Sequence, residues 1–254
     1  LEEVASFVNA GSCEITASET EDKDWMNNWK QYFKPFVVDD LLIKPTWEEI
    51  PEGMEGKKLI QIDPGMAFGT GKHETTQLCI AGIRKYVKPG DNVLDVGTGS
   101  GIIPMTLKKH FPYAEVFAMD ISEKALEIAQ KNADFHQTEI KFLQADYLNT
   151  NLTEKYDVII SNPPYIGIDE NTEIEDSVKG FEPNIALFSP TQDALIFYRK
   201  ITKDCENHLN ENGLFFLEIN QKLGNETLEL FKNFSESELV KDLSGNDRFV
   251  MGRK

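Results

Sequence analysis

The chain is poor in cysteine and in basic residues. Its three cysteines, Cys13, Cys79 and Cys205, lie far apart and form no Cys-x-x-Cys pair, so the sequence indicates neither a disulfide framework nor a zinc site. The 26 Lys and Arg residues are outnumbered by 43 Asp and Glu, which gives a net charge of −17. Such a charge opposes unassisted binding to a phosphate backbone, so we expect no direct contact with nucleic acid.

Long apolar runs are also absent, as are internal repeats and low-complexity segments. No apolar stretch reaches membrane-spanning length, and the acidic N-terminal stretch lacks the basic start of a signal peptide. We therefore expect a cytoplasmic protein with no membrane partner. A chain of 254 residues is long enough to bury a sizeable core in one or two domains.

The most informative stretch is residues 92–101, which contain three glycines and read Asn-Val-Leu-Asp-Val-Gly-Thr-Gly-Ser-Gly. Its apolar start predicts a buried strand, and residues 102–110 predict a helix. Gly97, Gly99 and Gly101 lie between them, where free N–H groups and the helix dipole favour polar or anionic ligand groups. The spacing differs from the dinucleotide pattern Gly-x-Gly-x-x-Gly, so a plain strand–turn–helix connection stays open as the alternative.

Two acidic residues accompany this glycine loop. Asp95 lies near the end of the first strand, where its carboxylate is placed to accept a hydrogen bond from a ligand amine or hydroxyl. A second strand over 116–119 ends at Asp120, about 20 residues after the glycines, where an acidic side chain typically binds a ribose hydroxyl. Ser122 is expected to cap a helix that runs to about residue 135.

A fourth strand over 156–161 leads directly into Asn-Pro-Pro-Tyr, residues 162–165. Together with Asp-Val-Gly-Thr-Gly-Ser-Gly, Asp120 and Ala145-Asp146, this tetrapeptide resembles the class I methyltransferases that use S-adenosylmethionine. From about Gly101 to the last residue, the chain is similar to the HemK/PrmC-type release-factor glutamine methyltransferases. The matching stretches are residues 162–166, 181–183 with 186–187, 193–195 with 198–199, 217–219 and 242–253.

Residues 63–76 contain Gly-Lys but do not form a phosphate-binding P-loop, because Met66 and His73 occupy two of its required positions. This run resembles instead the cofactor-covering loop of PrmA-type ribosomal-protein methyltransferases, a resemblance that covers about residues 1–100. It implies that Phe68 and Gly69 close over the cofactor and that Thr76 contacts it. The chain is thus expected to be a mosaic, and a natural hybrid and an engineered chimera would look alike at the join.

The combined resemblance implies an α/β fold with a Rossmann-like, mostly parallel seven-stranded sheet, helices on both faces and an antiparallel terminal hairpin. Further strands are expected at 41–44, 59–62, 140–144 and 213–219, further helices at 193–209 and 221–234, and the hairpin at 239–252. Residues 1–55 are expected to form an extension or linker that resembles the PrmA-type interdomain region. Residues 56–254 are expected to form the methyltransferase domain.

The Asn-Pro-Pro-Tyr loop has a chemistry that follows from its residues. A glutamine amide nitrogen is a poor nucleophile because its lone pair is delocalised, so a catalyst has to orient it. The Asn162 side-chain oxygen and the Pro163 carbonyl can each accept one substrate N–H. Pro163 and Pro164 fix φ and stiffen the loop, and Tyr165 can pack on the flat amide. A rigid turn after a strand is the alternative interpretation of the tetrapeptide.

The resemblance also implies a set of site residues and S-adenosylmethionine as cofactor, with S-adenosylhomocysteine as product. It requires no metal. The implied catalytic residues are Asn162, Pro163 and Tyr165, and Pro164 joins them in binding substrate. The implied cofactor-binding residues are Phe68, Gly69, Thr76, Asp95, Gly97, Thr98, Gly99, Gly101, Asp120, Ile121, Asp146, Tyr147 and Asn162.

Three functions stay open. The favoured one is methylation of a glutamine side-chain amide in a release factor, and the alternative is PrmA-type methylation of lysine or amino-terminal groups in a ribosomal protein. In both cases the partner is a protein of translation. A nucleic-acid adenine methyltransferase shares the tetrapeptide, but the net charge of −17 opposes it. The third possibility is a cofactor-binding chimera with little or no turnover.

Overall fold

The computed structural model describes residues 30, 33–63, 74–165, 189, 191–242 and 245–254. The chain divides into two compact units, Leu1–Phe33 and Lys34–Lys254, and every element described below belongs to the second unit. Phe68 and Gly69, predicted to cover the cofactor, lie outside the described residues, as does the 181–187 stretch.

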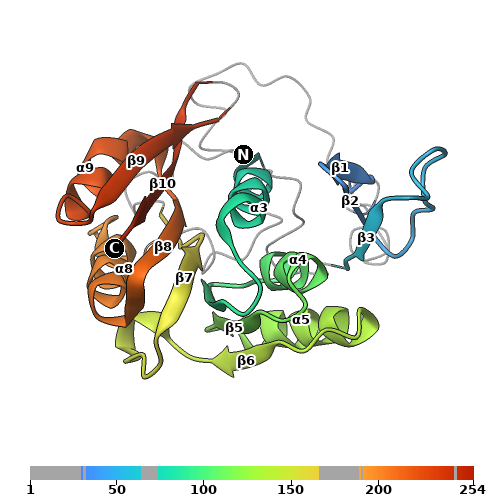
Figure 1. Cartoon of the computed structure of the whole chain (residues 1–254), viewed down its shortest axis with the longest axis horizontal. Helices are drawn as coiled ribbons and strands as arrows, with labels where there is room; N and C mark the ends of the chain where they lie inside the picture. Colours follow the sequence, from blue (N-terminus) through green and yellow to red (C-terminus); the bar gives the residue numbers. More distant parts are fainter. Residues whose placement is uncertain (1–29, 31–32, 64–73, 166–188, 190, 243–244) are drawn as a thin grey trace, which may run out of the picture. The chain divides into compact units, whose positions relative to one another are not determined.

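The central sheet has seven strands in the order β6-β5-β4-β7-β8-β10-β9 (Figure 1). β4 to β8 run parallel to one another, and β10 is antiparallel to both β8 and β9. This arrangement confirms the predicted fold class, including the terminal hairpin. The strands are β4 (Asn92–Val96), β5 (Glu115–Asp120), β6 (Lys141–Gln144), β7 (Tyr156–Ser161), β8 (Leu209–Glu218), β9 (Glu236–Lys241) and β10 (Asp247–Arg253).

Helices follow the strands as the sequence pattern predicts. The Ser122 side chain accepts the backbone hydrogen of Ala125 at 3.3 Å and caps its helix, as expected. None of the helices among the described ranges combines the length and the apolar character needed to cross a membrane. The helices are α3 (Glu74–Tyr86), α4 (Ile102–His110), α5 (Glu123–Phe135), α8 (Ile196–His208) and α9 (Gly224–Leu230), with short 3-10 turns η2 (Tyr147–Asn149) and η4 (Gln221–Leu223).

Two helix boundaries differ from the prediction. α8 begins at Ile196 instead of residue 193, because the Asp193 carboxylate accepts the Leu195 backbone hydrogen and forms a turn before the helix. The helix expected over 221–234 is only α9, preceded by the 3-10 turn η4. It ends early because Phe231 leaves the helix to stack on Phe215, with ring centroids 4.3 Å apart.

Helices cover both faces of the sheet (Figure 1). The described residues form two buried apolar clusters. Successive residues of a strand point to opposite faces. Ile159 of β7 belongs to a buried cluster with Tyr198 of α8, whereas Ile160 belongs to a second buried cluster with Ile83 of α3. β7 is therefore apolar on both of its sides, as expected for a strand of a parallel sheet that helices cover on both faces.

A second, three-stranded sheet precedes the main one in the sequence. It contains β1 (Phe36–Val38), β2 (Leu41–Lys44) and β3 (Lys58–Gln61) in that order. The expected strands near 41–44 and 59–62 are confirmed, whereas β1 was not expected because three residues carry no periodicity. Ion pairs from Arg84 of α3 to Asp39 (2.6 Å) and Asp40 (2.9 Å) connect this sheet to the main domain. The division expected after residue 55 stays a prediction.

Candidate functional site

The glycine loop between β4 and α4 has the conformation that its sequence requires. Gly97, Gly99 and Gly101 have φ values of 77°, 56° and 84°, in the left-handed region that favours glycine. The backbone N–H groups of Gly97 and Thr98 both donate to the Met119 carbonyl, at 2.8 and 3.0 Å. The loop is therefore fixed to the end of the neighbouring strand β5.

Asp120, at the end of β5, is part of this loop's support. Its Oδ2 accepts the backbone hydrogen of Gly99 and its Oδ1 that of Ser122, both at 2.9 Å. The next side chain, Ile121, is an apolar residue that remains 45% exposed. The end of β5 thus offers a fixed carboxylate, expected to bind ribose, beside an exposed apolar side chain that the resemblance includes among the cofactor-binding residues.

Two buried polar atoms lie below the glycine loop without a hydrogen-bond partner among the described residues. They are Oδ2 of Asp95 and Oγ1 of Thr98. Burial raises the pKa of the Asp95 carboxyl to about 7; the Thr98 side chain beside it acts to lower this pKa, and the negative charge of Asp120 acts to raise it. Buried polar groups are nearly always paired, so these atoms fit a ligand that brings hydrogen-bond donors to the loop.

The Asn-Pro-Pro-Tyr loop lies beside the glycine loop because β4 and β7 are neighbours. Val96 pairs with Ser161, and the Ser161 hydroxyl donates to the Val96 carbonyl at 3.0 Å. A Cβ atom built on Gly97 would lie 3.7 Å from the Asn162 carbonyl oxygen. The structure therefore brings the expected cofactor loop and the expected catalytic loop together at one edge of the sheet.

Tyr165 is held by two residues that the sequence did not single out. Its hydroxyl donates to Oε1 of Glu218, and its carbonyl accepts from Nδ2 of Asn220, both at 3.2 Å. Glu218 ends β8 and is only 3% exposed. The signal that could have found it is the one that drew attention to Asp95 and Asp120, namely a carboxylate at the carboxyl end of a central strand.

The remaining expected cofactor residues have varied surroundings. Thr76 lies in α3 and is 8% exposed. The Asp146 carboxylate accepts hydrogen bonds from Leu148 and Asn149 in the η2 turn. The Tyr147 hydroxyl donates to Oδ2 of Asp204 at 2.7 Å inside the core, so this hydroxyl already has a partner within the protein.

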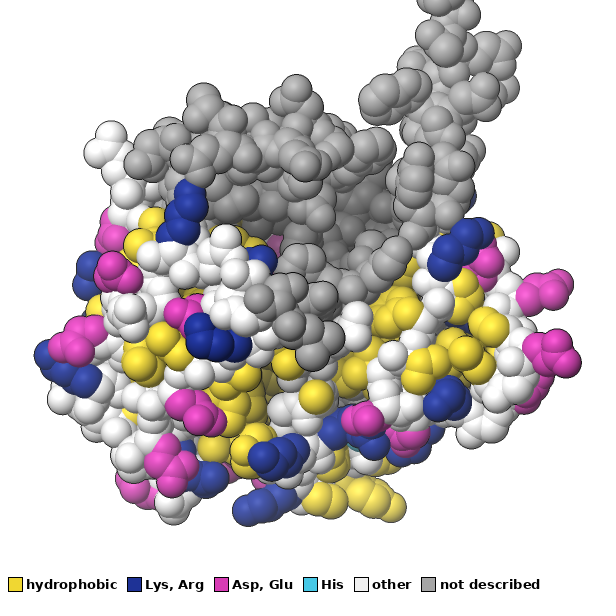
Figure 2. All heavy atoms as spheres, turned by 90° about the horizontal axis from the view of Figure 1, so that it is seen from above, with side chains coloured by type: hydrophobic (Ala, Val, Ile, Leu, Met, Phe, Trp, Pro, Cys, Tyr) yellow, Lys and Arg dark blue, Asp and Glu magenta, His cyan; other side chains and the backbone are white. Residues whose placement is uncertain are grey.

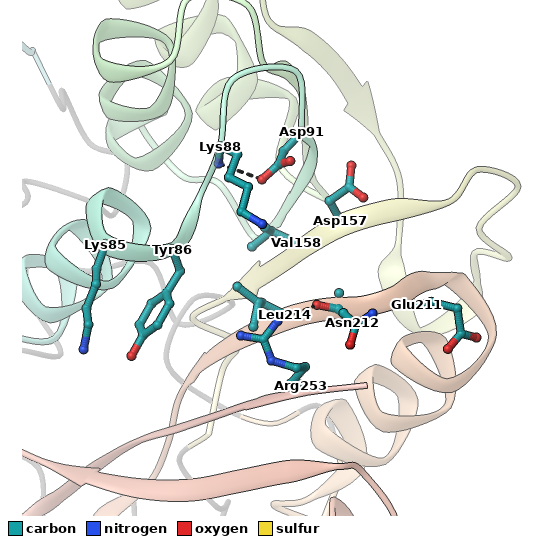
Figure 3. A pocket seen from close by; sticks show the side chains of 11 residues that line it. Lys85, Tyr86, Lys88, Asp91, Asp157, Val158, Glu211, Asn212, Leu214 and Arg253 are labelled. Carbon is teal, nitrogen blue, oxygen red and sulfur yellow. Dashed lines mark hydrogen bonds between the residues drawn. The ribbon is translucent and has the colours of Figure 1, made fainter.

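A cavity of about 390 Å³ lies elsewhere on the domain (Figure 3). Its lining includes Asp91 and Asp157, which stand at the amino ends of β4 and β7, together with Lys88 and Arg253. The glycine loop and Asn162 follow the carboxyl ends of the same strands. The cavity is therefore at the opposite edge of the sheet from the candidate site, and its mixed charges do not select one sign of ligand.

The fold and the site define a class of protein. Residues 87–242 match a family model described as a methyltransferase domain. In the structure this region contains the parallel strands, the glycine loop after β4 and the acidic residue at the end of β5. The chain is a class I S-adenosylmethionine-dependent methyltransferase, as the sequence predicted. Within that class, the ribosomal protein L11 methyltransferase (PrmA) model matches residues 2–163, and the chain belongs to this family.

Individual relatives carry two different names. A protein of Lachnoclostridium phytofermentans named ribosomal protein L11 methyltransferase is 47% identical over 163 residues, which is 64% of this chain and 49% of that protein. A protein of Flavobacterium psychrophilum named release factor glutamine methyltransferase is 47% identical over 161 residues, 62% of this chain and 56% of that protein. The chain thus spans about half the length of these relatives, and the two names are consistent with the expected mosaic.

A solved structure shares the fold. The crystal structure of ribosomal protein L11 methylase from Lactobacillus delbrueckii subsp. bulgaricus has a TM-score of 0.63 and 25% sequence identity. The superposition covers 87% of this chain and 100% of that chain.

Proposed function

We propose that the chain transfers a methyl group from S-adenosylmethionine to a nitrogen atom of a protein. The adjacency of the two loops supports this most directly: Val96 pairs with Ser161 just before the loops, and a Cβ atom added at Gly97 would lie 3.7 Å from the Asn162 carbonyl oxygen. One loop suits the cofactor, and the other offers acceptors for substrate N–H groups. Holding two reactants in line at one edge can lower a barrier by roughly 7–11 kcal/mol in ideal geometry.

The residues around the glycine loop fit the cofactor. We assign the ribose hydroxyls to the Asp120 carboxylate and the base to the exposed Ile121 side chain, and Asp95 and Thr98 add buried polar atoms beside the loop. When it is bound, S-adenosylmethionine supplies an electrophilic methyl group, so the protein's own task is to orient the accepting nitrogen. Phe68 and Gly69 stay a prediction from the resemblance.

Ribosomal protein L11 is the substrate that the comparisons favour. The family model covers residues 2–163 and includes the loops discussed above up to Pro163. For an amine, the Asn162 side-chain oxygen and the Pro163 carbonyl would accept N–H hydrogens and leave the lone pair free to face the methyl group. Methylation of a ribosomal protein, which the sequence left as the alternative, has more support from the comparisons than methylation of a release-factor glutamine.

A release-factor glutamine is the second candidate substrate, and a specific observation favours it. Pro164 and Tyr165 complete Asn-Pro-Pro-Tyr, and the structure holds the Tyr165 hydroxyl on Glu218. A fixed aromatic ring beside two acceptors suits a flat amide better than a flexible ammonium group. One relative named release factor glutamine methyltransferase supports the same substrate.

The charge of the chain suits a basic protein partner. The net charge is −17, and Lys and Arg side chains are scattered among Asp and Glu on the face shown in Figure 2. A net negative charge of this size attracts a basic protein electrostatically and repels a phosphate backbone. The absence of direct nucleic-acid binding stays a prediction.

One assay separates these functions. The chain is incubated with methyl-labelled S-adenosylmethionine and, side by side, with ribosomal protein L11, a peptide chain release factor and a DNA oligomer containing adenine. Label on L11 supports the first substrate, and label on a release-factor glutamine supports the second. Cofactor binding by calorimetry without label on any substrate would leave a binding protein without turnover and would contradict the proposal.

A further inference from the structure

The end of strand β8 holds the last residue of the catalytic loop from two sides. Glu218 accepts the Tyr165 hydroxyl at 3.2 Å, and Asn220 donates its side-chain N–H to the Tyr165 carbonyl, also at 3.2 Å. The ring of Tyr165 also packs against the buried cluster that contains Ile219. Side chain and backbone of one residue are therefore fixed to the same neighbouring strand end.

The two holding residues are themselves well fixed. Glu218 is 3% exposed, and its backbone carbonyl accepts the hydroxyl of the fully buried Tyr198 at 2.9 Å. The Asn220 side-chain oxygen accepts the Lys222 backbone hydrogen at 3.0 Å and caps the η4 turn. A hydrogen bond to a partner in a locked position fixes geometry more effectively than one to a mobile partner.

The composition of the loop makes such support necessary. Pro163 and Pro164 have no backbone N–H, so neither can donate to the scaffold. Upstream, the loop is joined to β4 through the Ser161 hydroxyl, which donates to Val96 at 3.0 Å. Downstream, two hydrogen bonds of Tyr165, one from its hydroxyl to Glu218 and one from Asn220 to its carbonyl, join the loop to the end of β8.

We propose that Glu218 and Asn220 are positioning residues for methyl transfer, which fix Tyr165 and through it the acceptor groups of Asn162 and Pro163. This inference rests on the proposed function, because its kinetic readout is methylation of the protein substrate. Neither residue touches the reacting atoms. Glu218 acts as a hydrogen-bond acceptor and not as a base, so its charge is dispensable while its acceptor oxygen is not.

Near-isosteric variants test the two bonds separately. Glu218→Gln keeps an acceptor oxygen and removes the charge, whereas Glu218→Leu removes the acceptor. Asn220→Asp keeps the oxygen that caps η4 and removes the N–H that holds the Tyr165 carbonyl. Tyr165→Phe removes the donor itself, and Tyr156→Phe makes the same chemical change at the opposite end of the neighbouring β7, as a matched control.

The expected kinetic result is specific. Tyr165→Phe, Glu218→Leu and Asn220→Asp lower kcat for the better protein substrate by about tenfold to a hundredfold, the range of a lost hydrogen bond to a charged or buried group. Affinity for S-adenosylhomocysteine by calorimetry stays near wild type, and Glu218→Gln and Tyr156→Phe keep most of kcat. The double variant Tyr165→Phe/Glu218→Leu is no worse than either single variant, because both remove the same bond.

Two outcomes would overturn the inference. Additive losses in the double variant would show that Tyr165 and Glu218 act independently. A loss in Glu218→Gln as deep as in Glu218→Leu would show that the charge is required, as for a base.

A measurement without turnover separates this inference from the proposed function. Incorporation of 3-fluorotyrosine at position 165 gives a ¹⁹F resonance that should shift or broaden in Glu218→Leu and stay unchanged in Tyr156→Phe. If Glu218→Leu leaves the shift and line width of that resonance unchanged, the positioning role is contradicted, whether or not turnover changes. If it responds while the wild type methylates no substrate, the hold on Tyr165 stands and the proposed function fails.

Discussion

Asp120 accepts the backbone hydrogen of Gly99 at 2.9 Å, so the carboxylate expected to bind ribose also shapes the glycine loop. Its other oxygen accepts the Ser122 backbone hydrogen at 2.9 Å, just before α5. One side chain thus connects the end of β5, the glycine loop and the start of a helix. Any substitution of Asp120 has to be interpreted with both roles in view.

Asp120→Ala is expected to weaken cofactor binding by roughly 1.5–3 kcal/mol, the range for a hydrogen bond to a charged group. Asp120→Asn keeps one acceptor oxygen for the loop and removes the charge, so it should lose less affinity than Asp120→Ala. Calorimetry with S-adenosylhomocysteine measures both, and urea denaturation of the ligand-free variants reports the cost to the loop. Wild-type affinity in Asp120→Ala would show that ribose is bound elsewhere.

Asn162→Ala is expected to lower kcat by about 10²–10³, by analogy with the loss of one preorganised contact in a dry site. Asn162→Asp keeps the shape and an acceptor but adds a negative charge, so it tests whether a neutral acceptor is needed. Cofactor affinity should change less than kcat in both, because the glycine loop and Asp120 are left intact. Equal rates for wild type and Asn162→Ala would remove Asn162 from the catalytic assignment.

Gly101→Ala should destabilise the fold more than Gly90→Ala, although both positions have left-handed φ values of 84° and 90°. A Cβ at Gly101 would lie 3.1 Å from the Ala129 Cβ, whereas one at Gly90 would meet nothing within 4 Å. Both variants bear the backbone strain of about 1–2 kcal/mol, and only Gly101→Ala adds overpacking of about 1–3 kcal/mol. Equal urea midpoints for Gly101→Ala and Gly90→Ala would show that α5 moves away from the added methyl group without loss of stability.

Asn132→Ala is expected to lower the free energy of unfolding by about 1–3 kcal/mol, the cost of unsatisfied buried polar groups. The Asn132 amide, 6% exposed, donates to the Ser100 carbonyl at 3.0 Å and exchanges hydrogen bonds with the Asp63 backbone. Gln130→Ala, on the exposed side of the same helix, is the control and should change stability by less than about 0.5 kcal/mol. Similar losses in the two variants would contradict a bridging role for Asn132.

Asp95 is expected to make stability fall as the pH rises. Its pKa is raised to about 7 in the folded protein by burial, against an ordinary value of 3.8. Between these values the unfolded chain releases the proton and the folded chain keeps it, so unfolding is favoured progressively up to pH 7 and no further above it. Relative to Asp95→Asn, the ligand-free wild type should lose stability between about pH 4 and pH 7 in urea denaturation. A pH-independent difference would contradict the raised pKa.

The local sequence by itself determined the order of elements and most of the candidate site at the carboxyl ends of the strands. Helix α4 has the predicted bounds, Ser122 caps α5, and the glycines adopt the conformations that their spacing indicates. These features depend on neighbours a few residues away, such as hydrophobic periodicity and turn chemistry, which a sequence displays directly. The carboxyl ends of parallel strands share one edge, so the neighbourhood of Asp95 and Asp120 followed as well.

Only the tertiary structure decided how the Asn-Pro-Pro-Tyr loop is held and which polar groups bond to residues far away in the sequence. Tyr165 and Glu218 are 53 residues apart in sequence, and they meet because β8 pairs with β7. The Tyr147 hydroxyl turned out to serve Asp204 in the core, 57 residues away. Such contacts depend on strand order and on helix packing over the sheet, which bring distant residues into register and leave no periodic signal in the chain.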